Sequence, residues 1–249
     1  MQRYFVKNSQ IRGNNIYING LDYHHITHVM RMLPGQKISI IDEMGVNYLT
    51  LISQINKKEV VLEIISQSEF NNELPITVTV ALGLTKFSKM EEVIRRITEL
   101  GASQFIGVEM ERSNLRLNKL PPLKIDRWEL IVKEAAEQSG RSQLMKISPF
   151  QSFPSFLEES SHYDVCMFAY EESGRQNNFS LKTLLKQSNY RSLLVLVGPE
   201  GGIAEKEAQL LLERGFQAVG LGPRILRCET APLYLMSVIS LMKEFIDEG

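Results

Sequence analysis

The hydrophobic pattern of this chain changes near Pro75, and this change limits the possible folds more than any other feature. Up to about Phe70, apolar residues fall in short runs typical of β-strands, separated by turn residues. After Pro75, strand-like runs alternate with helical patterns, which indicates an α/β fold with a largely parallel sheet. We therefore predict two domains, at residues 1–70 and 74–249, joined by a polar linker at residues 68–73.

The first domain is expected to be a small β-barrel or sandwich. Its predicted strands are residues 3–6, 15–18, 37–41, 48–55 and 60–65. One helix interrupts them at residues 22–33, where His25, Val29 and Met32 recur at helical spacing before Pro34-Gly35. A domain of this size and pattern is compatible with a binding module.

The second domain is expected to hold a parallel sheet covered by helices on both faces, because its strands are almost continuously apolar. Its predicted strands are residues 76–82, 104–109, 164–170, 193–197 and 218–221. Predicted helices occupy residues 88–100, with Ser88 and Glu91 as a capping box, and residues 126–140. A further helix begins near Glu205, and a last one extends from about Thr230 to Asp247.

Composition excludes several classes of protein. The 28 Lys and Arg nearly balance the 29 Asp and Glu, so any affinity for nucleic acid must come from local patches. Two cysteines far apart and no secretory leader make a disulfide scaffold improbable, and we expect a cytosolic protein. The longest apolar runs fall short of the roughly 20 residues that cross a bilayer, so we expect no membrane span.

The segment Gly198-Pro199-Glu200-Gly201-Gly202 follows a predicted strand and precedes a helix. Ligand crevices of α/β sheets lie at this end of a strand, and glycines let the backbone approach a ligand closely. The spacing matches neither the dinucleotide fingerprint nor the phosphate-binding loop. Glu200 repels phosphate but tolerates a cationic or zwitterionic ligand, such as a sulfonium cofactor. A tight turn with an exposed glutamate is the alternative interpretation.

A second loop, residues 221–229, follows the next predicted strand and leads into the last helix. It carries Arg224, Arg227 and Glu229 between a Gly-Pro pair and the helix N-terminus. Burying three charged side chains in a structural turn would require them to pair with one another. We therefore interpret them as site residues, and a solvated loop capped by Thr230 remains the alternative.

Two further segments carry groups that bind RNA. Gln138 and Arg141 lie at the end of the helix at residues 126–140, where a plain helix C-terminus would look similar. Residues 112–124 contain four basic side chains and no acidic one, although such a run is often simply solvated. The basic residues of this segment are Arg112, Arg116, Lys119 and Lys124. Arg3 and Arg31 extend the candidate RNA-binding set into the first domain.

In combination, these strings resemble the RsmE family of ribosomal RNA methyltransferases in the SPOUT superfamily. The strings are Glu137-Gln138-Ser139-Gly140-Arg141, Gly198-Pro199-Glu200-Gly201-Gly202 and Leu221-Gly222-Pro223-Arg224-Ile225-Leu226-Arg227. The first domain resembles the family's PUA-like RNA-binding domain in residues 3–6 and in the stretch from His24 to Met32. Cys228 stands where the family usually has Thr, so it is either a tolerated change or a change in how Glu229 is held.

The resemblance implies more than the residues show. It implies a homodimer that methylates N3 of one uridine in 16S ribosomal RNA, with S-adenosylmethionine bound in a C-terminal trefoil knot and the last helix in the dimer interface. The substrate is then 16S ribosomal RNA or the small ribosomal subunit, with no metal. The implied cofactor-binding residues are Tyr170, Gly198, Pro199, Glu200, Gly201, Gly202, Leu221, Gly222, Ile225 and Leu226.

Methylation of uridine N3 sets chemical requirements that the second loop can meet. The site must align N3 with the activated methyl group, and N3 must lose its proton. Arg224 and Arg227 are predicted to stabilise charge on the uracil carbonyls. Glu229 is the predicted proton acceptor, with Glu200 second, and the alternative is that either carboxylate orients an arginine through a salt bridge.

Three alternatives remain open at this point. A non-catalytic RNA-binding or ribosome-assembly factor would use the same basic residues. A nucleotide-dependent oxidoreductase would explain the α/β pattern, but Gly83-Leu84-Thr85-Lys86 replaces the dinucleotide fingerprint after the first strand of the second domain. His24 and His28 have the spacing of a zinc-binding pair, but no third ligand is near in sequence. Cys166 is expected to be a buried small hydrophobe rather than a nucleophile.

Overall fold

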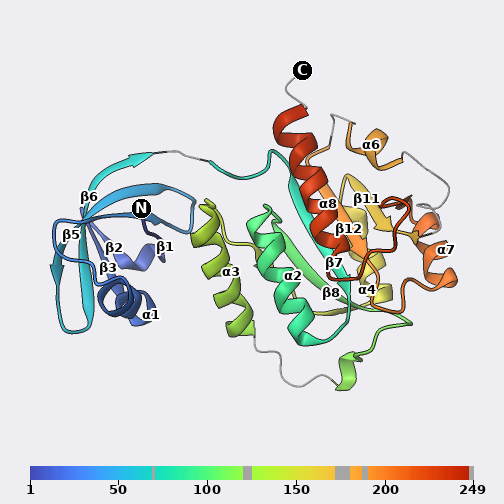
Figure 1. The fold of residues 1–249 in the computed structure, drawn as a ribbon, viewed down its shortest axis with the longest axis horizontal. Helices are drawn as coiled ribbons and strands as arrows, with labels where there is room; N and C mark the ends of the chain where they lie inside the picture. The colour runs from blue at the N-terminus through green and yellow to red at the C-terminus, as the bar shows by residue number, and fades with distance from the viewer. Residues whose placement is uncertain (69–70, 120–124, 172–179, 187–189, 247–249) are drawn as a thin grey trace. The chain divides into compact units, whose positions relative to one another are not determined.

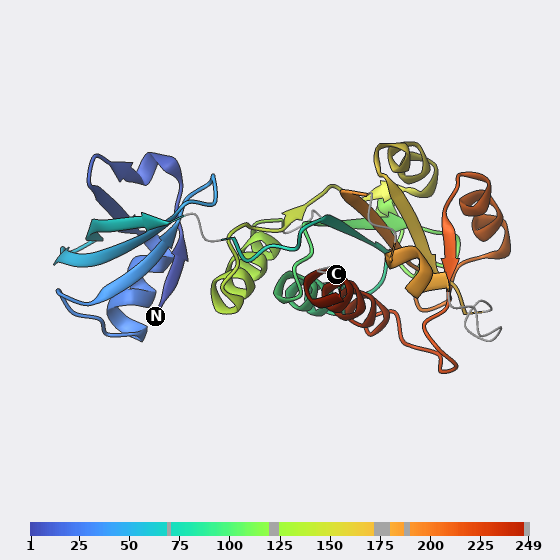
Figure 2. The same ribbon diagram turned by 90° about the horizontal axis from the view of Figure 1, so that it is seen from above.

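The computed structural model describes residues 1–68, 71–119, 125–171, 180–186 and 190–246 (Figures 1 and 2). Within these ranges the chain forms two compact units. The first comprises residues 1–73 with 136–143, and the second comprises residues 74–135 with 144–249.

The first unit is built on a curled, six-stranded sheet with the strand order β1-β4-β5-β6-β3-β2. The strands are β1 (Arg3–Phe5), β2 (Ile11–Arg12), β3 (Asn15–Asn19), β4 (Lys37–Ile41), β5 (Asn47–Ile55) and β6 (Glu59–Ser68). Only the β1–β4 pair is parallel among the pairs of this sheet. Alternate residues of β3 and β6 point into one apolar core, which includes Ile16, Ile18, Val60 and Leu62.

The helix of the first unit is shorter than predicted. It consists of α1 (Gly20–His24) and η2 (His25–Val29), after a short turn of helix η1 (Asn8–Gln10). Ile26 is fully buried, whereas the side chain of Val29 is 57% exposed. The backbone of Arg31 is left-handed, with φ of 51°, which a right-handed helix cannot accommodate. The apolar spacing at residues 25–32 therefore overestimated the length of this helix.

The second unit contains the predicted parallel sheet, in which every strand pair is parallel. The strand order is β10-β8-β7-β12-β11-β13, with β9 also paired to β8. The strands are β7 (Thr77–Gly83), β8 (Gln104–Glu109), β9 (Lys146–Ile147), β10 (Gln151–Ser152), β11 (Val165–Ala169), β12 (Ser192–Val197) and β13 (Gln217–Val219). Because the strands are parallel, the loops after β7, β11, β12 and β13 leave the same edge of the sheet.

Helices cover both faces of this sheet, as predicted, and separate the apolar side chains into two clusters (Figure 2). One face packs against α2 (Phe87–Glu99), α3 (Ile125–Ser139), α6 (Ser180–Leu185) and α8 (Ala231–Ser240). The other packs against α4 (Phe153–Glu159) and α7 (Glu205–Glu213). The remaining helical segments are η3 (Leu117–Lys119), η4 (Ser160–His162) and η5 (Leu241–Ile246).

Some local predictions for this unit need correction. The sequence predicted neither the strands β9 and β10 nor the helix α4. Helix α2 begins at Phe87, and no side chain caps its N-terminus, so the predicted capping box of Ser88 and Glu91 is wrong. The predicted end of the last helix near Asp247 lies outside the described residues. The trefoil knot stays a prediction.

No helix in the described part of the chain combines the length and apolar character needed to span a membrane.

Candidate functional site

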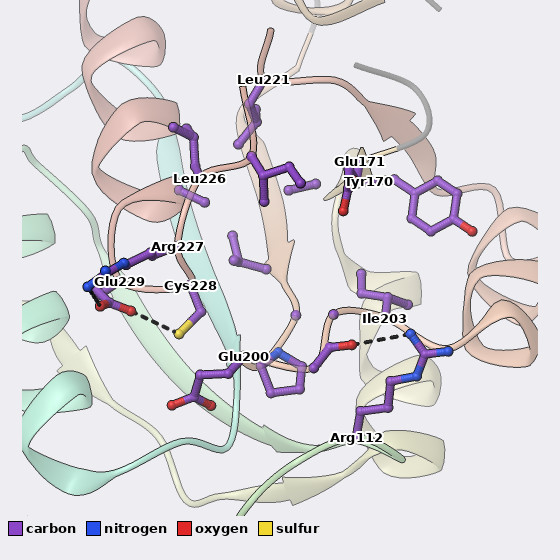
Figure 3. A pocket seen from close by; sticks show the side chains of 18 of the residues that line it. Arg112, Tyr170, Glu171, Glu200, Ile203, Leu221, Leu226, Arg227, Cys228 and Glu229 are labelled. Carbon is purple, nitrogen blue, oxygen red and sulfur yellow. Dashed lines mark hydrogen bonds and ion pairs between the residues drawn. The ribbon is translucent and has the colours of Figure 1, made fainter. Parts of the chain in front are cut away.

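A pocket of about 610 Å³ lies at the edge of the sheet where the strand-end loops of the second unit meet (Figure 3). The loops after β11, β12 and β13 line it, together with Lys89 of α2 and Arg112 of the loop after β8. Strand β11 lies between β12 and β13, so three adjacent strands deliver these loops. A backbone hydrogen bond of 3.0 Å from Tyr170 N to Val219 O ties the ends of β11 and β13 together.

The pocket brings together the residues that the sequence assigned to the cofactor and to catalysis. Figure 3 shows Glu200, Cys228 and Glu229 on one side of the pocket and Arg112 and Tyr170 on the other. The lining residues that the sequence predicted are Tyr170, Gly198, Pro199, Glu200, Gly201, Gly202, Leu221, Gly222, Arg224, Ile225, Leu226, Arg227 and Glu229. These residues come from segments far apart in the sequence, and the parallel sheet places them around one cavity.

The first loop of the pocket requires glycine at several positions. A Cβ atom on Gly198 would lie 2.8 Å from Ile203 Cγ1, and one on Gly201 would lie 2.9 Å from Arg112 Cβ. Gly202 has φ of +72°, and its N–H donates to Pro199 O at 2.8 Å, which closes a tight turn. Arg112 also donates from Nη1 to Gly201 O at 3.2 Å. The loop is therefore packed closely against its surroundings. Its conformation requires glycine, which has no side chain, at these positions.

Lys89, which the sequence analysis missed, joins the two loops of the pocket. Its Nζ lies 3.2 Å from Glu200 Oε1 and 3.3 Å from Glu229 Oε2. Glu200 also accepts hydrogen bonds from Thr85 Oγ1 and, at 3.0 Å, from Asn114 Nδ2. A signal existed in the sequence, because Thr85 lies in the loop after β7 and Lys89 lies in the first turn of the next helix, and β7 ends at the same edge of the sheet.

The acid–base properties of the two glutamates follow from these contacts. Burial raises the pKa of Glu200, but hydrogen bonds from Thr85, the backbone and Lys89 outweigh burial and lower it. Burial also raises the pKa of Glu229, but hydrogen bonds from Cys228, the backbone and Lys89 outweigh burial and lower it. The hydrogen bond to Glu200 raises the pKa of Lys89. Near neutral pH the cluster is therefore one ammonium between two carboxylates.

Cys228 contacts Glu229 directly. Its thiol donates to Glu229 Oε2 at 3.2 Å. Burial and this hydrogen bond raise the pKa of Cys228 to about 12, so the thiol stays protonated and remains a donor. Of the two interpretations of Cys228, the contact favours a role in holding Glu229.

Arg224 and Arg227 are exposed at the rim of the pocket. The Arg227 side chain is 84% exposed, and its Nη1 lies 4.0 Å from Glu229 Oε1. The basic partner of Glu200 and Glu229 at close range is therefore Lys89 rather than an arginine. Figure 3 shows the Arg227 side chain beside Glu229, and its high exposure leaves the guanidinium accessible from solvent.

The basic loop after β8 is partly structural. Arg116 donates to Glu111 O at 2.8 Å and to Met110 O at 3.1 Å, so its guanidinium holds the loop in shape. Lys119 is exposed at the end of η3. Lys124 lies outside the described residues.

In the first unit, the candidate RNA-binding residues differ in exposure. Arg31 and Gln138 are exposed, and Arg3 is half-buried with Nη1 donating to Gly140 O. Arg141 is only 3% exposed, and its guanidinium forms an ion pair with Glu73. A buried, paired guanidinium is not accessible to RNA, so the assignment of Arg141 to RNA binding is corrected to a structural role.

We expect Arg141→Ala to lower the free energy of unfolding by about 2 kcal/mol, because it removes charged hydrogen bonds to a buried carboxylate. In this variant Glu73 still accepts hydrogen bonds from the backbone N–H groups of Ser142 and Gln143, at 2.8 and 3.0 Å. These bonds limit the loss of stability. Urea denaturation measures the change, with the exposed Arg31→Ala as the matched control. Equal stability of the two variants would contradict the structural role.

The histidine and cysteine candidates outside the pocket do not assemble a site. Among residues that the structure describes, no group of three or more His, Cys, Asp or Glu side chains is arranged to hold a metal ion. The rings of His24 and His28 stack on each other, with centroids 4.7 Å apart. Burial raises the pKa of Cys166 to about 11, which makes it a poor nucleophile.

Comparison with known proteins agrees with this architecture. Residues 72–240 match the family model of an RNA methyltransferase domain, and residues 18–65 match that of an RNA methyltransferase PUA domain. Ribosomal RNA small subunit methyltransferase E of Bacillus subtilis is 40% identical, over 99% of this chain and 98% of its own length. The protein of the same name from Synechocystis is 34% identical, over 97% of this chain and 78% of its own length.

A solved structure extends the comparison to three dimensions. The ribosomal RNA small subunit methyltransferase E of Neisseria gonorrhoeae, bound to S-adenosyl methionine, superposes with a TM-score of 0.85 at 26% identity. The match covers 98% of this chain and 99% of that one. Sequence and fold therefore agree from end to end, and the chain belongs to the ribosomal RNA small subunit methyltransferase E family.

Proposed function

We propose that this protein is a cytosolic methyltransferase that transfers a methyl group from S-adenosylmethionine to N3 of a uridine in 16S ribosomal RNA. The observation that carries the proposal is the pocket, where the glycine-rich loop (residues 198–202) meets the arginine-bearing loop (residues 221–229). These loops follow β12 and β13, two parallel strands with β11 between them. Relatives named for methylation of small-subunit ribosomal RNA, and a solved relative bound to S-adenosyl methionine, support the activity. The choice of uridine N3 rests on the family resemblance.

The residues of the pocket fit S-adenosylmethionine. A volume of about 610 Å³ lies within the range of cofactor sites. Leu221, Leu226 and Ile203 offer apolar surface to an adenine ring, and the glycines of the first loop leave backbone groups accessible. Glu200 and Glu229 place two carboxylates in the pocket around one ammonium, that of Lys89, and carboxylates attract the sulfonium and ammonium groups of the cofactor.

The chain's own residues have to orient the uracil and stabilise its charge. When bound, the cofactor supplies an activated methyl group. Arg224 and Arg227 would stabilise negative charge on the uracil carbonyls as N3 loses its proton. The lowered pKa of Glu229 and its ion pair with Lys89 make it a weak base, which favours orientation over proton acceptance.

RNA contact is proposed for basic and polar residues of both units that are exposed or, for Arg3, partly exposed. Phosphate groups attract such side chains without regard to sequence. The proposed residues are Arg3, Arg31, Arg112, Arg116, Lys119 and Gln138. The target uridine would have to leave any helical stack to reach the pocket.

The direct test is methyl transfer from labelled S-adenosylmethionine to small ribosomal subunits that lack the modification. Mass spectrometry of the nucleosides is expected to show labelled N3-methyluridine. Binding of the subunits without transfer would favour the non-catalytic RNA-binding factor instead. A labelled nucleoside other than N3-methyluridine would keep the enzyme class and reject the position.

We also propose a homodimer that buries the exposed apolar face of the last helix. Tyr234 of α8 is 41% exposed, and Leu241 and Phe245 of η5 are 51% and 74% exposed. Leu241 follows Tyr234 by about two helical turns, and Phe245 follows Leu241 by about one turn. The three side chains therefore share one face of the helix. An exposed apolar face of this kind is typical of an interface between subunits.

We expect Phe245→Glu to convert the dimer into a monomer, because a buried, unpaired carboxylate in an apolar interface is costly. Light scattering after size exclusion should change from about twice the chain mass to 28.4 kDa. Leu212→Glu, at a residue of α7 that is 54% exposed, is the matched control and should leave the mass unchanged. A dimeric Phe245→Glu protein would place the interface elsewhere.

A further inference from the structure

The ammonium group of Lys89 connects two loops that come from strands not adjacent in the sheet. Glu200 belongs to the loop after β12, and Glu229 belongs to the loop between β13 and α8. Strand β11 separates β12 from β13. Lys89 lies in the first turn of α2, and its Nζ is within 3.3 Å of one oxygen of each carboxylate. One side chain thus contacts both loops.

We propose that Lys89 is a positioning residue that holds Glu200 and Glu229 together and thereby fixes the arginine-bearing loop against the glycine-rich loop. This inference rests on the proposed function of the pocket, since the two loops are its proposed cofactor and substrate walls. Without the ammonium, two carboxylates that share one partner would repel each other, and the loops would separate.

The contacts of the two carboxylates show which loop depends more on Lys89. Glu200 has two other donors, Thr85 of the loop after β7 and Asn114 of the loop after β8. Glu229 has the thiol of its neighbour Cys228 and a guanidinium, that of Arg227, at 4.0 Å. The Arg227 side chain is 84% exposed, so water strongly screens its charge. Loss of Lys89 is therefore expected to act chiefly on Glu229 and on the loop that carries Arg224 and Arg227.

Partial burial makes this cluster stronger than an ordinary surface ion pair. The side chains of Lys89, Glu200 and Glu229 are 30%, 27% and 18% exposed. Burial by itself raises the pKa of both glutamates, and hydrogen bonds, including those from Lys89, reverse the effect. Removing Lys89 leaves burial and mutual repulsion, so one carboxyl group becomes easier to protonate. The loss of ligand affinity caused by removing Lys89 should therefore diminish as the pH falls.

The test is a calorimetric titration with S-adenosylhomocysteine, which lacks the positive sulfur and therefore reports the shape of the pocket rather than its charge. At about pH 8 we expect Lys89→Met to bind about tenfold more weakly than the wild type. Lys89→Met/Glu229→Gln should bind no more weakly than Lys89→Met, because both substitutions remove the same bridge between the loops. As the pH is lowered from about 8 toward about 5, the range in which carboxyl groups begin to protonate, the affinity of Lys89→Met should rise, whereas that of the wild type should change less.

Two controls make the result specific. Lys206→Met removes an exposed lysine of α7 that does not line the pocket, and it should bind like the wild type. Lys89→Arg keeps the charge and should keep the affinity within about threefold. If circular dichroism shows that Lys89→Met does not fold, Glu229→Gln tests the proposal instead. This substitution should also weaken binding, because it releases the arginine-bearing loop from Lys89.

The proposal would be overturned by Lys89→Met binding within twofold of the wild type at pH 8. It would also be overturned by a double variant that shows the sum of the two single losses, or by Glu229→Gln binding like the wild type. A wild-type protein that binds neither S-adenosylmethionine nor S-adenosylhomocysteine would instead contradict the proposed function. The two failures are therefore distinguishable.

Discussion

Arg227→Ala is expected to lower kcat for RNA methylation by about 10²- to 10³-fold while leaving the affinity for S-adenosylmethionine nearly unchanged. The Arg227 side chain is 84% exposed at the rim of the pocket, so it contributes little to the packing of the loop. Uracil is neutral in the ground state and gains negative charge as N3 loses its proton. The guanidinium therefore interacts more strongly with the transition state than with the substrate, and its removal lowers kcat.

Single-turnover methylation of small ribosomal subunits, together with calorimetric titration of the cofactor, separates these two effects. Arg214→Ala is the matched control, because Arg214 is an exposed arginine at the end of α7 that does not line the pocket. An Arg227→Ala protein with normal kcat and a raised KM for RNA would assign Arg227 to binding alone.

Gly83→Ala is expected to weaken cofactor binding by about 100-fold or more. Gly83 is the last residue of β7, and a Cβ atom there would lie 2.5 Å from Pro199 N and 3.0 Å from Gly198 C. These are backbone atoms of the glycine-rich loop, so no side-chain rotation relieves the overlap. The loop must move by a substantial part of an ångström, and displacements near 1 Å in a site cost about 10²-fold.

Gly107→Ala provides a control of the same kind at a position away from the pocket. A Cβ atom on Gly107 would lie 2.6 Å from Phe150 Cδ1 and 2.9 Å from Leu84 Cδ2, which are side-chain atoms of the core. This variant should lose stability in thermal denaturation but keep cofactor affinity when folded. Cofactor affinity of Gly83→Ala equal to that of Gly107→Ala would show that the β7–loop contact does not shape the pocket.

The regular elements of the second unit were predictable because their signals are local. The apolar run at residues 104–109 gives β8 with the predicted bounds, and the stripe from Met90 to Ile97 faces the core as expected. Parallel pairing followed from alternation of strands and helices. The short strands β9 and β10 were not predicted, because pieces of two residues carry too little periodicity to be recognised.

The candidate site was only partly predictable. The glycine-rich and arginine-bearing loops were found from their residue types and from their position after strands. Arg141 was misassigned, because an arginine at a helix end has the same sequence signature whether it is solvated or, as here, paired with Glu73. Its burial depends on Glu73, a residue in another part of the chain.

The sequence by itself determined the fold class, the change from a β-rich to an α/β domain and the loops that form the pocket. These features depend on periodicity and on glycine, proline and charged residues within short segments, whose effects on the backbone are local. Only the tertiary structure decided that Lys89 pairs with both Glu200 and Glu229, and that these glutamates have lowered pKa values. Electrostatic interactions depend on distance and burial in space, and the packing of the sheet sets both.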